Sequence, residues 1–270
     1  GIIIPDQHYP LDDKAAVNCV VKAIRKIKPD VFVNLGDVGE WESVSAWKYK
    51  DKKLPPLEFQ LPIVNEDIRL VNEGLDVWDE VLEEVKCKKK YLLQGNHDLW
   101  LDNFSNKYPY LNNYNFFKAC KIKERGYKYT EYNLPIQIGK LTFFHGAFAT
   151  TYHAKKHLET YGENVMYGHT HDLQRFTKTR KGGTISAWSL GCLKNIQILY
   201  NQFQGMIIVV VSLSKFQFHA FTMLLHFASM IHAGDIVVKL PASQGAASVT
   251  TPVSTTWTAA LTTTNTVNKL

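Results

Sequence analysis

The fold is decided by two stretches, Ile2-Ile-Ile-Pro-Asp-Gln-His8 and Val31-Phe-Val-Asn-Leu-Gly-Asp37, in which a short apolar run leads directly into acidic or imidazole side chains. Between them, residues 12–28 carry apolar side chains at helical spacing, and Pro29 predicts where that helix ends. Strand, helix and strand in fewer than forty residues form a βαβ unit. Such a unit predicts a parallel sheet whose functional loops lie at the carboxyl ends of its strands.

Apolar runs further along the chain predict more elements of the same kind. Residues 64–85 have the amphipathic pattern of a long surface helix, and we interpret its many acids as the solvated face. Short strands are expected at residues 91–93, 140–144 and 164–167, each followed within two residues by glycine or histidine. Alternating apolar residues around 127–138 predict a hairpin.

The last third of the chain differs in composition. From Met206 it is apolar, but polar and charged residues interrupt it, so strands are expected and a membrane-spanning helix is not. Residues 241–270 hold nine threonines and one charged side chain, which indicates a low-complexity tail, disordered or loosely β. We therefore expect one domain over residues 1–240, followed by a tail over residues 241–270.

Overall composition excludes few classes of protein. The 270 residues are 45% hydrophobic, enough for a substantial core, and the net charge of +6 suits anionic substrates without indicating a dedicated nucleic-acid binder. The four cysteines are far apart and form no C-x-x-C pair, which indicates neither a zinc ribbon nor a disulfide framework. With a start too short and uncharged for a signal peptide, this favours a reducing, cytoplasmic location.

Side chains that could bind metal follow the first two predicted strands. Asp6 and His8 lie two apart, so in extended backbone they share a face and reach the same point beyond the strand. The alternative for this pair is a turn aspartate beside a surface histidine. Asp37 follows Gly36 at the second strand end, where it is either a bridging carboxylate or the N-cap of a helix.

The later strands are followed by a denser set of polar residues. Gly95-Asn96-His97-Asp98 offers an amide oxygen, an imidazole, and a carboxylate that could fix the tautomer of that imidazole. Three more imidazoles follow two further strands, those of His145, His169 and His171. Isolated histidines are usually surface or core residues, but three placed just past strand ends beside these acids favour a metal site.

Taken in order, the motifs D-x-H, G-D, G-N-H-D, H-G and G-H-T-H resemble those of the calcineurin-like metallophosphoesterase family, over roughly residues 2–175. The long acidic helix is similar to that of compact members common in phage and bacterial genomes, which implies a bacterial or phage-infected cell as the setting. The resemblance implies an α/β fold, a four-layer α/β/β/α sandwich of two mixed sheets. We expect the second sheet to take strands from about residues 127–145 and 183–222.

The resemblance also implies a ligand set for two divalent metal ions. One ion would be held by Asp6, His8 and His171, the other by Asn96, His145 and His169, with Asp37 bridging the two. Mixed oxygen and imidazole ligands suit manganese, which we favour, and also iron, zinc or nickel, with magnesium as a further alternative.

The chemistry implied is hydrolysis of a phosphoester. A hydroxide bridging the ions would attack in line, and His97, oriented by Asp98, would protonate the leaving oxygen. The basic residues Arg175, Lys178, Arg180 and Lys181 are candidate contacts to a second phosphate or a nucleic-acid backbone; a solvated hairpin turning at Gly182-Gly183 is the alternative.

The substrate remains open at this level, between phosphomonoesters and phosphodiesters, including nucleotides and nucleic acid. His97 favours esters whose leaving groups need protonation, so a phosphodiesterase or nuclease is the leading hypothesis. A protein phosphatase is less well supported, because Asp37 is not followed by an acid-Arg-Gly segment and the later motif ends in Asp98. The second class of function is a catalytically silent binding or structural module of a larger assembly.

Overall fold

The computed structural model describes residues 1–195, 206–212 and 219–225. Within them, six strands form a first sheet in the order β11, β10, β1, β2, β3, β4. Strands β1 to β4 run parallel to one another, and β10 joins β1 antiparallel, so the sheet is mixed. The bounds of these strands are β1 (Ile2–Ile4), β2 (Val31–Asn34), β3 (Lys89–Leu93), β4 (Lys128–Thr130), β10 (Met206–Ser212) and β11 (His219–Leu225).

A second sheet of five strands has the order β5, β6, β7, β9, β8 within the same described residues. Its centre is parallel, from β6 through β7 to β9, and both edges are antiparallel, so this sheet is also mixed. The bounds are β5 (Ile136–Ile138), β6 (Leu141–Phe143), β7 (Val165–Tyr167), β8 (Leu173–Arg180) and β9 (Gly183–Leu190).

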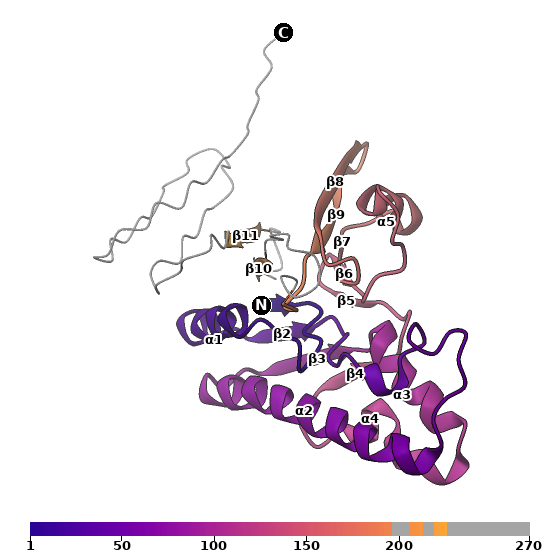
Figure 1. The fold of residues 1–270 in the computed structure, drawn as a ribbon. Coiled ribbons are helices and arrows are strands. Elements are labelled where there is room, and N and C mark those ends of the chain that lie inside the picture. The colour runs from indigo at the N-terminus through magenta and orange to yellow at the C-terminus, as the bar shows by residue number, and fades with distance from the viewer. Residues whose placement is uncertain (196–205, 213–218, 226–270) are drawn as a thin grey trace.

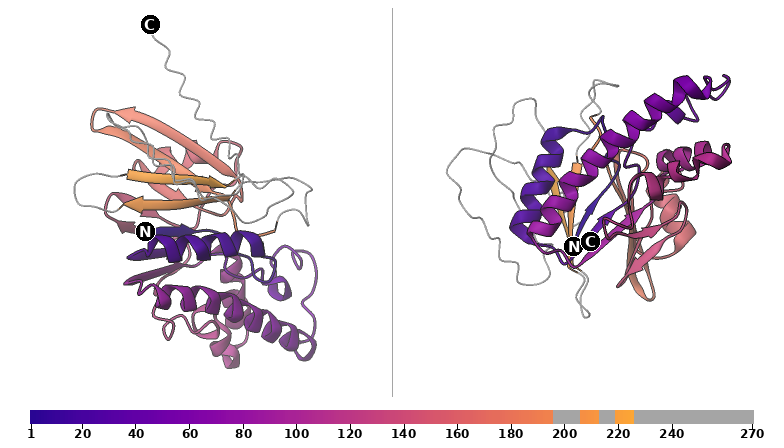
Figure 2. Two further views of the ribbon diagram at one scale, coloured as in Figure 1. Left: turned by 90° about the vertical axis from the view of Figure 1, so that its left-hand side faces the viewer. Right: turned by 90° about the horizontal axis from the view of Figure 1, so that it is seen from below.

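Helices lie outside the two sheets (Figure 1), and Figure 2 shows α1 and α2 side by side on one side of the molecule. The two sheets share a core, and α5 packs on the second sheet, which gives the expected α/β/β/α sandwich. The helical bounds are α1 (Lys14–Ile27), η1 (Glu42–Val44), α2 (Leu57–Glu84), α3 (Asn96–Asn106), η2 (Pro109–Tyr114), α4 (Phe116–Ala119) and α5 (His153–Tyr161).

The alternation of side chains along β1 shows how the layers are joined. Ile2 and Ile4 point into the core beneath α1 and α2, whereas Ile3 points into the core between the two sheets. All three side chains are buried, because successive residues of a strand point to opposite faces and both faces are covered. This is why the strand consists of β-branched residues alone, without polar alternation.

Helix α1 begins and ends where the sequence predicts. The carboxylate of Asp13 accepts hydrogen bonds from the amides of Ala15 and Ala16, at 2.9 and 3.1 Å, which caps the first turn. At the other end Lys28 adopts a left-handed conformation immediately before Pro29. The helix thus returns the chain from the end of β1 to the start of β2, which places the loops after both strands at the same sheet edge.

Helix α2 is longer than the sequence pattern indicates. It starts at Leu57 rather than near residue 64, and Pro62 lies inside its second turn. The missing amide of Pro62 removes a single hydrogen bond close to the helix start, a cost that burial of the helix elsewhere outweighs. Trp78 is fully buried against Phe32, with ring centroids 6.0 Å apart.

Two expectations about the strands are wrong. Residues 127–138 do not form a hairpin: β4 pairs parallel with β3 in the first sheet, while β5 pairs with β6 in the second. The alternation in this stretch comes from two separate edge strands, joined by a turn at Asn133 that crosses between sheets. Strands β10 and β11, expected in the second sheet, extend the first sheet because the free edge of β1 accepts an antiparallel partner.

The chain beyond residue 225 lies outside the described residues, as does the expected boundary between a domain over 1–240 and a tail over 241–270. In the part of the chain that the structure does describe, each helix is too short or too polar to cross a bilayer.

The packing of α2 generates a stability prediction. Leu75 lies on the buried face of this helix and is fully buried, whereas Val77 of the same helix is 39% exposed. Leu75→Ala should lower the free energy of unfolding by about 2–5 kcal/mol, because a cavity adds to the lost burial. Val77→Ala, the matched control, should change it by less than about 0.5 kcal/mol. Urea denaturation measures both; equal effects would contradict the packing described.

Candidate metal centre

Seven side chains from five loops meet at one edge of the two sheets. Each loop follows a strand, so the carboxyl ends of β1, β2 and β3 face those of β6 and β7 across the sandwich. These are the seven positions predicted as ligands, and the structure brings all of them together: Asp6, His8, Asp37, Asn96, His145, His169 and His171.

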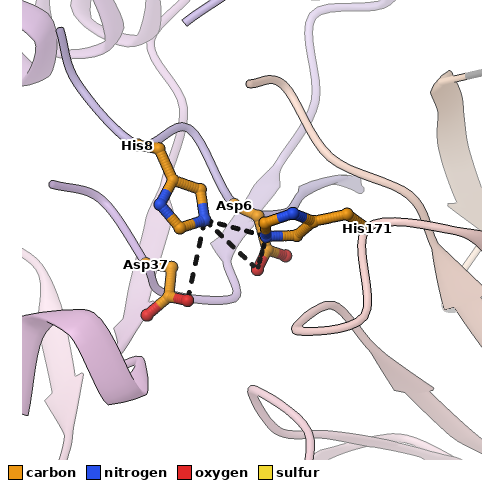
Figure 3. A group of neighbouring side chains, drawn as sticks. All are labelled: Asp6, His8, Asp37 and His171. Carbon is orange, nitrogen blue, oxygen red and sulfur yellow. Dashed lines mark hydrogen bonds and ion pairs between the residues drawn. The ribbon is translucent and has the colours of Figure 1, made fainter. Parts of the chain in front are cut away.

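The first group consists of Asp6, His8, Asp37 and His171 (Figure 3). The Nε2 atom of His8 lies 2.9 Å from Nε2 of His171, 3.7 Å from Oδ2 of Asp37 and 4.0 Å from Oδ1 of Asp6. Nε2 of His171 is in turn 3.6 Å from Oδ1 of Asp6. Four ligand atoms therefore face one small space.

The second group consists of Asp37, Asn96, His145 and His169. Oδ1 of Asn96 lies 3.0 Å from Nε2 of His145 and 2.8 Å from Nδ1 of His169. Oδ2 of Asp37, the oxygen that faces His8, is also 3.3 Å from Nε2 of His145. The carboxylate of Asp37 thus lies between the two groups.

The backbone at these loops is held in conformations that L-residues rarely adopt. Asp6, His8 and Asp37 have φ values of 42°, 52° and 48°, and His169 and His171 have 71° and 60°. Each such residue costs on the order of 1–3 kcal/mol, and strain of this kind concentrates at functional sites. The fold thus maintains a ligand geometry that the local sequence alone would disfavour.

Glycine is required beside two of the carboxylates. A Cβ atom at Gly168 would collide with Oδ2 of Asp6, and one at Gly95 would collide with Oδ1 of Asp37. These close approaches allow backbone amides to reach the carboxylates: the His169 amide donates to both oxygens of Asp6, at 2.9 and 3.0 Å, and the His97 amide donates to Oδ1 of Asp37, at 2.8 Å.

The electrostatics of the site centre on Asp37. Burial alone would raise the pKa of Asp37, but the neighbouring imidazoles, His145 first, hold it well below its usual range. Burial likewise lowers the pKa of His145, yet the charge and hydrogen bond of Asp37 raise it to about 9. Burial lowers the pKa of His8 to about 4, so its Nε2 lone pair is free near neutral pH.

Two residues that sequence reasoning missed, Glu40 and Lys194, lie on the Nδ1 side of His8, opposite its Nε2 atom. Oε2 of Glu40 lies 2.9 Å from Nδ1 of His8, and Nζ of Lys194 donates to the same Glu40 oxygen at 2.7 Å. Although burial would raise the pKa of Glu40, its contacts with His8 and Lys194 lower it to about 2. A carboxylate on Nδ1 fixes the tautomer that presents Nε2 to the site.

The expected pairing of Asp98 with the His97 ring is wrong. Nδ1 of His97 donates instead to the backbone carbonyl of Glu40, at 3.0 Å. The buried carboxylate of Asp98 accepts from the amides of Val38 and Gly95, at 3.1 and 3.0 Å, and from the Trp41 indole, at 2.9 Å. Asp98 therefore ties the loop after β2 to the start of α3, which positions Asp37 and Asn96 relative to each other.

Desolvation also explains the electrostatic state of Asp98. Burial, and secondarily the charge of Asp37, raise the pKa of Asp98 to about 7. The surrounding N–H donors oppose this shift, since they stabilise the ionised form.

A cleft of about 500 Å³ opens beside the ligands. His97, Asn96 and His169 line it together with the exposed side chain of Trp47, and so does His153, which sequence reasoning also missed. The sequence around His153 gave no indication of a functional role, because a single histidine at the start of a helix is common. Its Nε2 atom lies 3.0 Å from the carboxylate of Asp172.

The basic residues proposed as substrate contacts are not among those lining the cleft. Arg175, Lys178 and Arg180 lie along β8, which forms a hairpin with β9 that turns at Lys181 and Gly182. Arg180 donates to the Gly162 carbonyl at 2.7 Å, and the guanidinium of Arg175 lies 5.8 Å from the centre of the Trp188 ring. In Figure 1 the β8–β9 hairpin extends upward, away from strands β1 to β4.

The two groups fit divalent cations. Ligands about 2.1 Å from an ion lie about 3.0–3.4 Å apart in tetrahedral or octahedral arrangements, close to the separations of 2.8–4.0 Å found here. The buried carboxylates of Asp6 and Asp37 both lie close to the His8 imidazole. Buried negative charge requires compensation, which a bound cation would supply. The mixture of oxygen and nitrogen ligands suits manganese, iron, zinc or nickel and excludes an all-oxygen calcium cage.

The support of His8 by Glu40 gives a prediction about metal affinity. Glu40→Ala should weaken metal binding about 10–100-fold, as loss of such supporting partners typically does. Glu42→Ala, two residues away and exposed, is the control and should leave affinity unchanged. Isothermal titration with manganese measures both variants, and an unaltered affinity for Glu40→Ala would contradict the supporting role.

The close approach at Gly168 gives a second prediction. Gly168→Ala should reduce manganese affinity at least about tenfold, because the added methyl group displaces the Asp6 carboxylate. Gly182→Ala introduces the same methyl group into open space at the hairpin turn and should have no effect. Circular dichroism checks that both variants fold. Equal metal affinity in the two folded variants would count against the geometry at Asp6.

Comparisons with known proteins show the family to which the chain belongs. Among solved structures, the chain is similar to zinc-bound Vps29 from Entamoeba histolytica, at 11% identity and a TM-score of 0.45, covering 89% of this chain and 96% of that one. It is also similar to YfcE, a phosphoesterase from E. coli, at 14% identity and a TM-score of 0.35, covering 80% and 94%. No curated protein matches the chain. The model of the calcineurin-like phosphoesterase family matches residues 2–178, which contain all seven positions predicted as ligands, and the chain therefore belongs to that family.

Proposed function

We propose that the protein is a phosphoesterase that uses two divalent metal ions, acts preferentially on phosphodiesters, and employs His97 as general acid. The single observation that carries this proposal is the position of Asp37. One oxygen of its carboxylate lies 3.7 Å from Nε2 of His8 in the first group and 3.3 Å from Nε2 of His145 in the second. A carboxylate placed in this way can bridge two ions, which a site for one ion does not need.

The division of ligands supports two ions rather than one. Asp6, His8 and His171 would hold the first ion, and Asn96, His145 and His169 the second. Two ions held by these residues would supply Lewis-acid polarisation of a phosphoryl oxygen and would activate a water molecule for attack. The raised pKa of His145 reflects an unusually negative environment, which favours any cation placed there. We propose manganese first, with iron, zinc, nickel or magnesium as alternatives.

His97 is placed to act on the substrate rather than to bind metal. Its ring lines the cleft and lies edge-on to His8, with centroids 4.6 Å apart, and it packs on Trp100 at 3.9 Å. Because Nδ1 donates to the Glu40 carbonyl, Nε2 remains available to carry a proton. Transfer of a proton from Nε2 of His97 to the leaving oxygen would increase the rate typically about 10²–10⁴-fold.

A diester suits this cleft better than a small monoester. The cleft of about 500 Å³ is lined by Trp47, Thr150 and Thr151 as well as by residues of the two ligand groups. This volume leaves room for both substituents of a phosphate held at the ligands. The alkoxide that leaves a diester is also a poor leaving group, which makes a general acid valuable.

This mechanism predicts that hydrolysis and metal content can be separated. The manganese-loaded protein should hydrolyse bis-p-nitrophenyl phosphate and the dinucleotide thymidylyl-thymidine. His97→Ala should lower kcat about 10²–10⁴-fold for the dinucleotide, whose alkoxide leaving group needs protonation, with metal content unchanged. Asp37→Asn should lose both activity and metal, because the bridging charge is removed. Lys26→Ala, on the exposed face of α1, is the control and should retain both.

The same experiment tests the alternative function. A wild-type protein that binds two manganese ions but hydrolyses no member of a phosphoester panel would overturn the enzymatic proposal. Such a protein would instead fit a binding module of a larger assembly, particularly if it purified together with other components. Activity confined to phosphoserine or phosphothreonine peptides would favour a protein phosphatase.

A further inference from the structure

The rim of the cleft carries a segment in which aromatic and basic side chains alternate. This rim segment comprises Trp47-Lys-Tyr-Lys-Asp-Lys-Lys53 and lies between η1 and α2. In Figure 1 the chain between these elements forms the dark loop that stands beside α3, whose first residues Asn96 and His97 belong to the site. The rim segment thus begins at Trp47, a residue that lines the cleft.

Trp47 has a large exposed aromatic surface at the cleft. Its side chain is 72% exposed and lines the same cleft as Asn96, His97 and His169. A tryptophan this exposed leaves apolar area in water, at a cost that its own contacts do not offset. Tyr152 follows the lining residue Thr151 and is 74% exposed. Two separate segments thus present an exposed aromatic side chain at the cleft or next to it.

The loop that presents Trp47 is anchored rather than loose. The hydroxyl of Ser43 donates to Asp67 of α2 at 2.6 Å, and the amide of Gln60 donates to the Ser43 carbonyl at 2.9 Å. After Ser43, successive turns are closed by backbone hydrogen bonds from Tyr49 to Ser45 and from Lys52 to Tyr49, both 3.2 Å. The backbone that carries Trp47 is thereby held in place before any ligand binds, which limits the entropy lost on binding.

Cationic side chains continue along the rim segment beyond the cleft. Nζ of Lys50 lies 5.9 Å from the centre of the Trp47 ring, so a positive charge accompanies the indole. Lys52 and Lys53 are exposed, and within the described part of the chain neither has an ion pair with a carboxylate. Aromatic platforms interleaved with lysines form the usual surface for a single-stranded nucleic acid, whose bases stack while its phosphates pair.

We propose that the rim segment binds a single-stranded nucleic acid, with a base stacked on Trp47 next to the phosphodiester at the metal site and the strand continuing along Lys52 and Lys53. This inference rests on the proposed phosphodiesterase function and specifies its substrate class. A free mononucleotide would use Trp47 alone, because its one phosphate is held at the ligands. The lysines that run on past the cleft match further phosphates, which only a strand supplies.

Binding is tested separately from catalysis. All variants carry His97→Ala so that the strand is not cut, and fluorescence anisotropy measures the Kd of the manganese-loaded full chain for fluorescein-labelled oligothymidylate. Trp47→Ala should raise the Kd about tenfold, within the range for loss of one base–aromatic stack. Trp47→Phe should retain most of the affinity, since a stacking face remains. Tyr110→Ala removes an equally exposed aromatic residue, 70% exposed on η2, and should change nothing.

The lysines are tested through salt. Lys52→Gln together with Lys53→Gln should reduce the slope of log Kd against log salt by about 1.4, because each lost phosphate contact on a single strand contributes about 0.7. Lys22→Gln together with Lys26→Gln removes the same charge from exposed positions on α1 and should leave the slope unchanged.

Each remaining outcome decides between the two proposals. A Kd insensitive to Trp47→Ala, or no binding of the oligonucleotide at low salt, would overturn the inference even if wild-type protein hydrolyses bis-p-nitrophenyl phosphate. Thymidine monophosphate binding as tightly as the strand would also overturn it, in favour of a nucleotide substrate. Binding that depends on Trp47 and on the lysines, in a wild-type protein without hydrolase activity, would support the rim proposal while refuting the enzymatic one.

Discussion

The structure depends on one buried carboxylate, that of Asp37. It lies between imidazoles that come from different sheets, His8 after β1 and His145 after β6, and these neighbours keep it ionised in spite of its burial. An isolated buried carboxylate would be protonated or displaced. Here the charge is shared with imidazoles on both sides, so the same contact joins the two halves of the sandwich and defines the space between the two ligand groups.

The four-layer fold is suited to create this arrangement. Parallel strands place β1, β2 and β3 with their carboxyl ends at one edge, and the second sheet brings those of β6 and β7 to the same place. Apolar side chains such as those of Ile3 and Val33 hold the two sheets face to face. Rigid strands thus carry the ligands, while the left-handed backbone needed at Asp6 and Asp37 is confined to short loops.

Much of this could be read from the sequence because it is local. The strands before each motif, the spacing of Asp6 and His8, and the G-N-H-D run are all visible within a few residues. The partners of those residues are not. Lys194 reaches Glu40 across 154 positions, so no pattern near either residue announces the contact that supports His8. The sequence feature that could have pointed to this contact is Glu40 itself, an acid three positions after Asp37.

The errors have the same origin. Asp98 follows His97 directly, but the start of α3 directs its carboxylate inward to Val38, Gly95 and Trp41, and a backbone carbonyl takes the place next to His97. Likewise Arg180 is close to His171 in the chain, but an extended strand of eight residues spans roughly 25 Å. Trp47 was overlooked because its proximity to His97 arises only from folding.

The central claim is that Asp37 bridges two cations, and anomalous diffraction from crystals grown with manganese tests it most directly. The account predicts two anomalous peaks about 3.5–4 Å apart, one bounded by Asp6, His8 and His171 and the other by Asn96, His145 and His169, with Asp37 between them. A single peak, or two peaks of which only one lies within bonding distance of the Asp37 carboxylate, would contradict it.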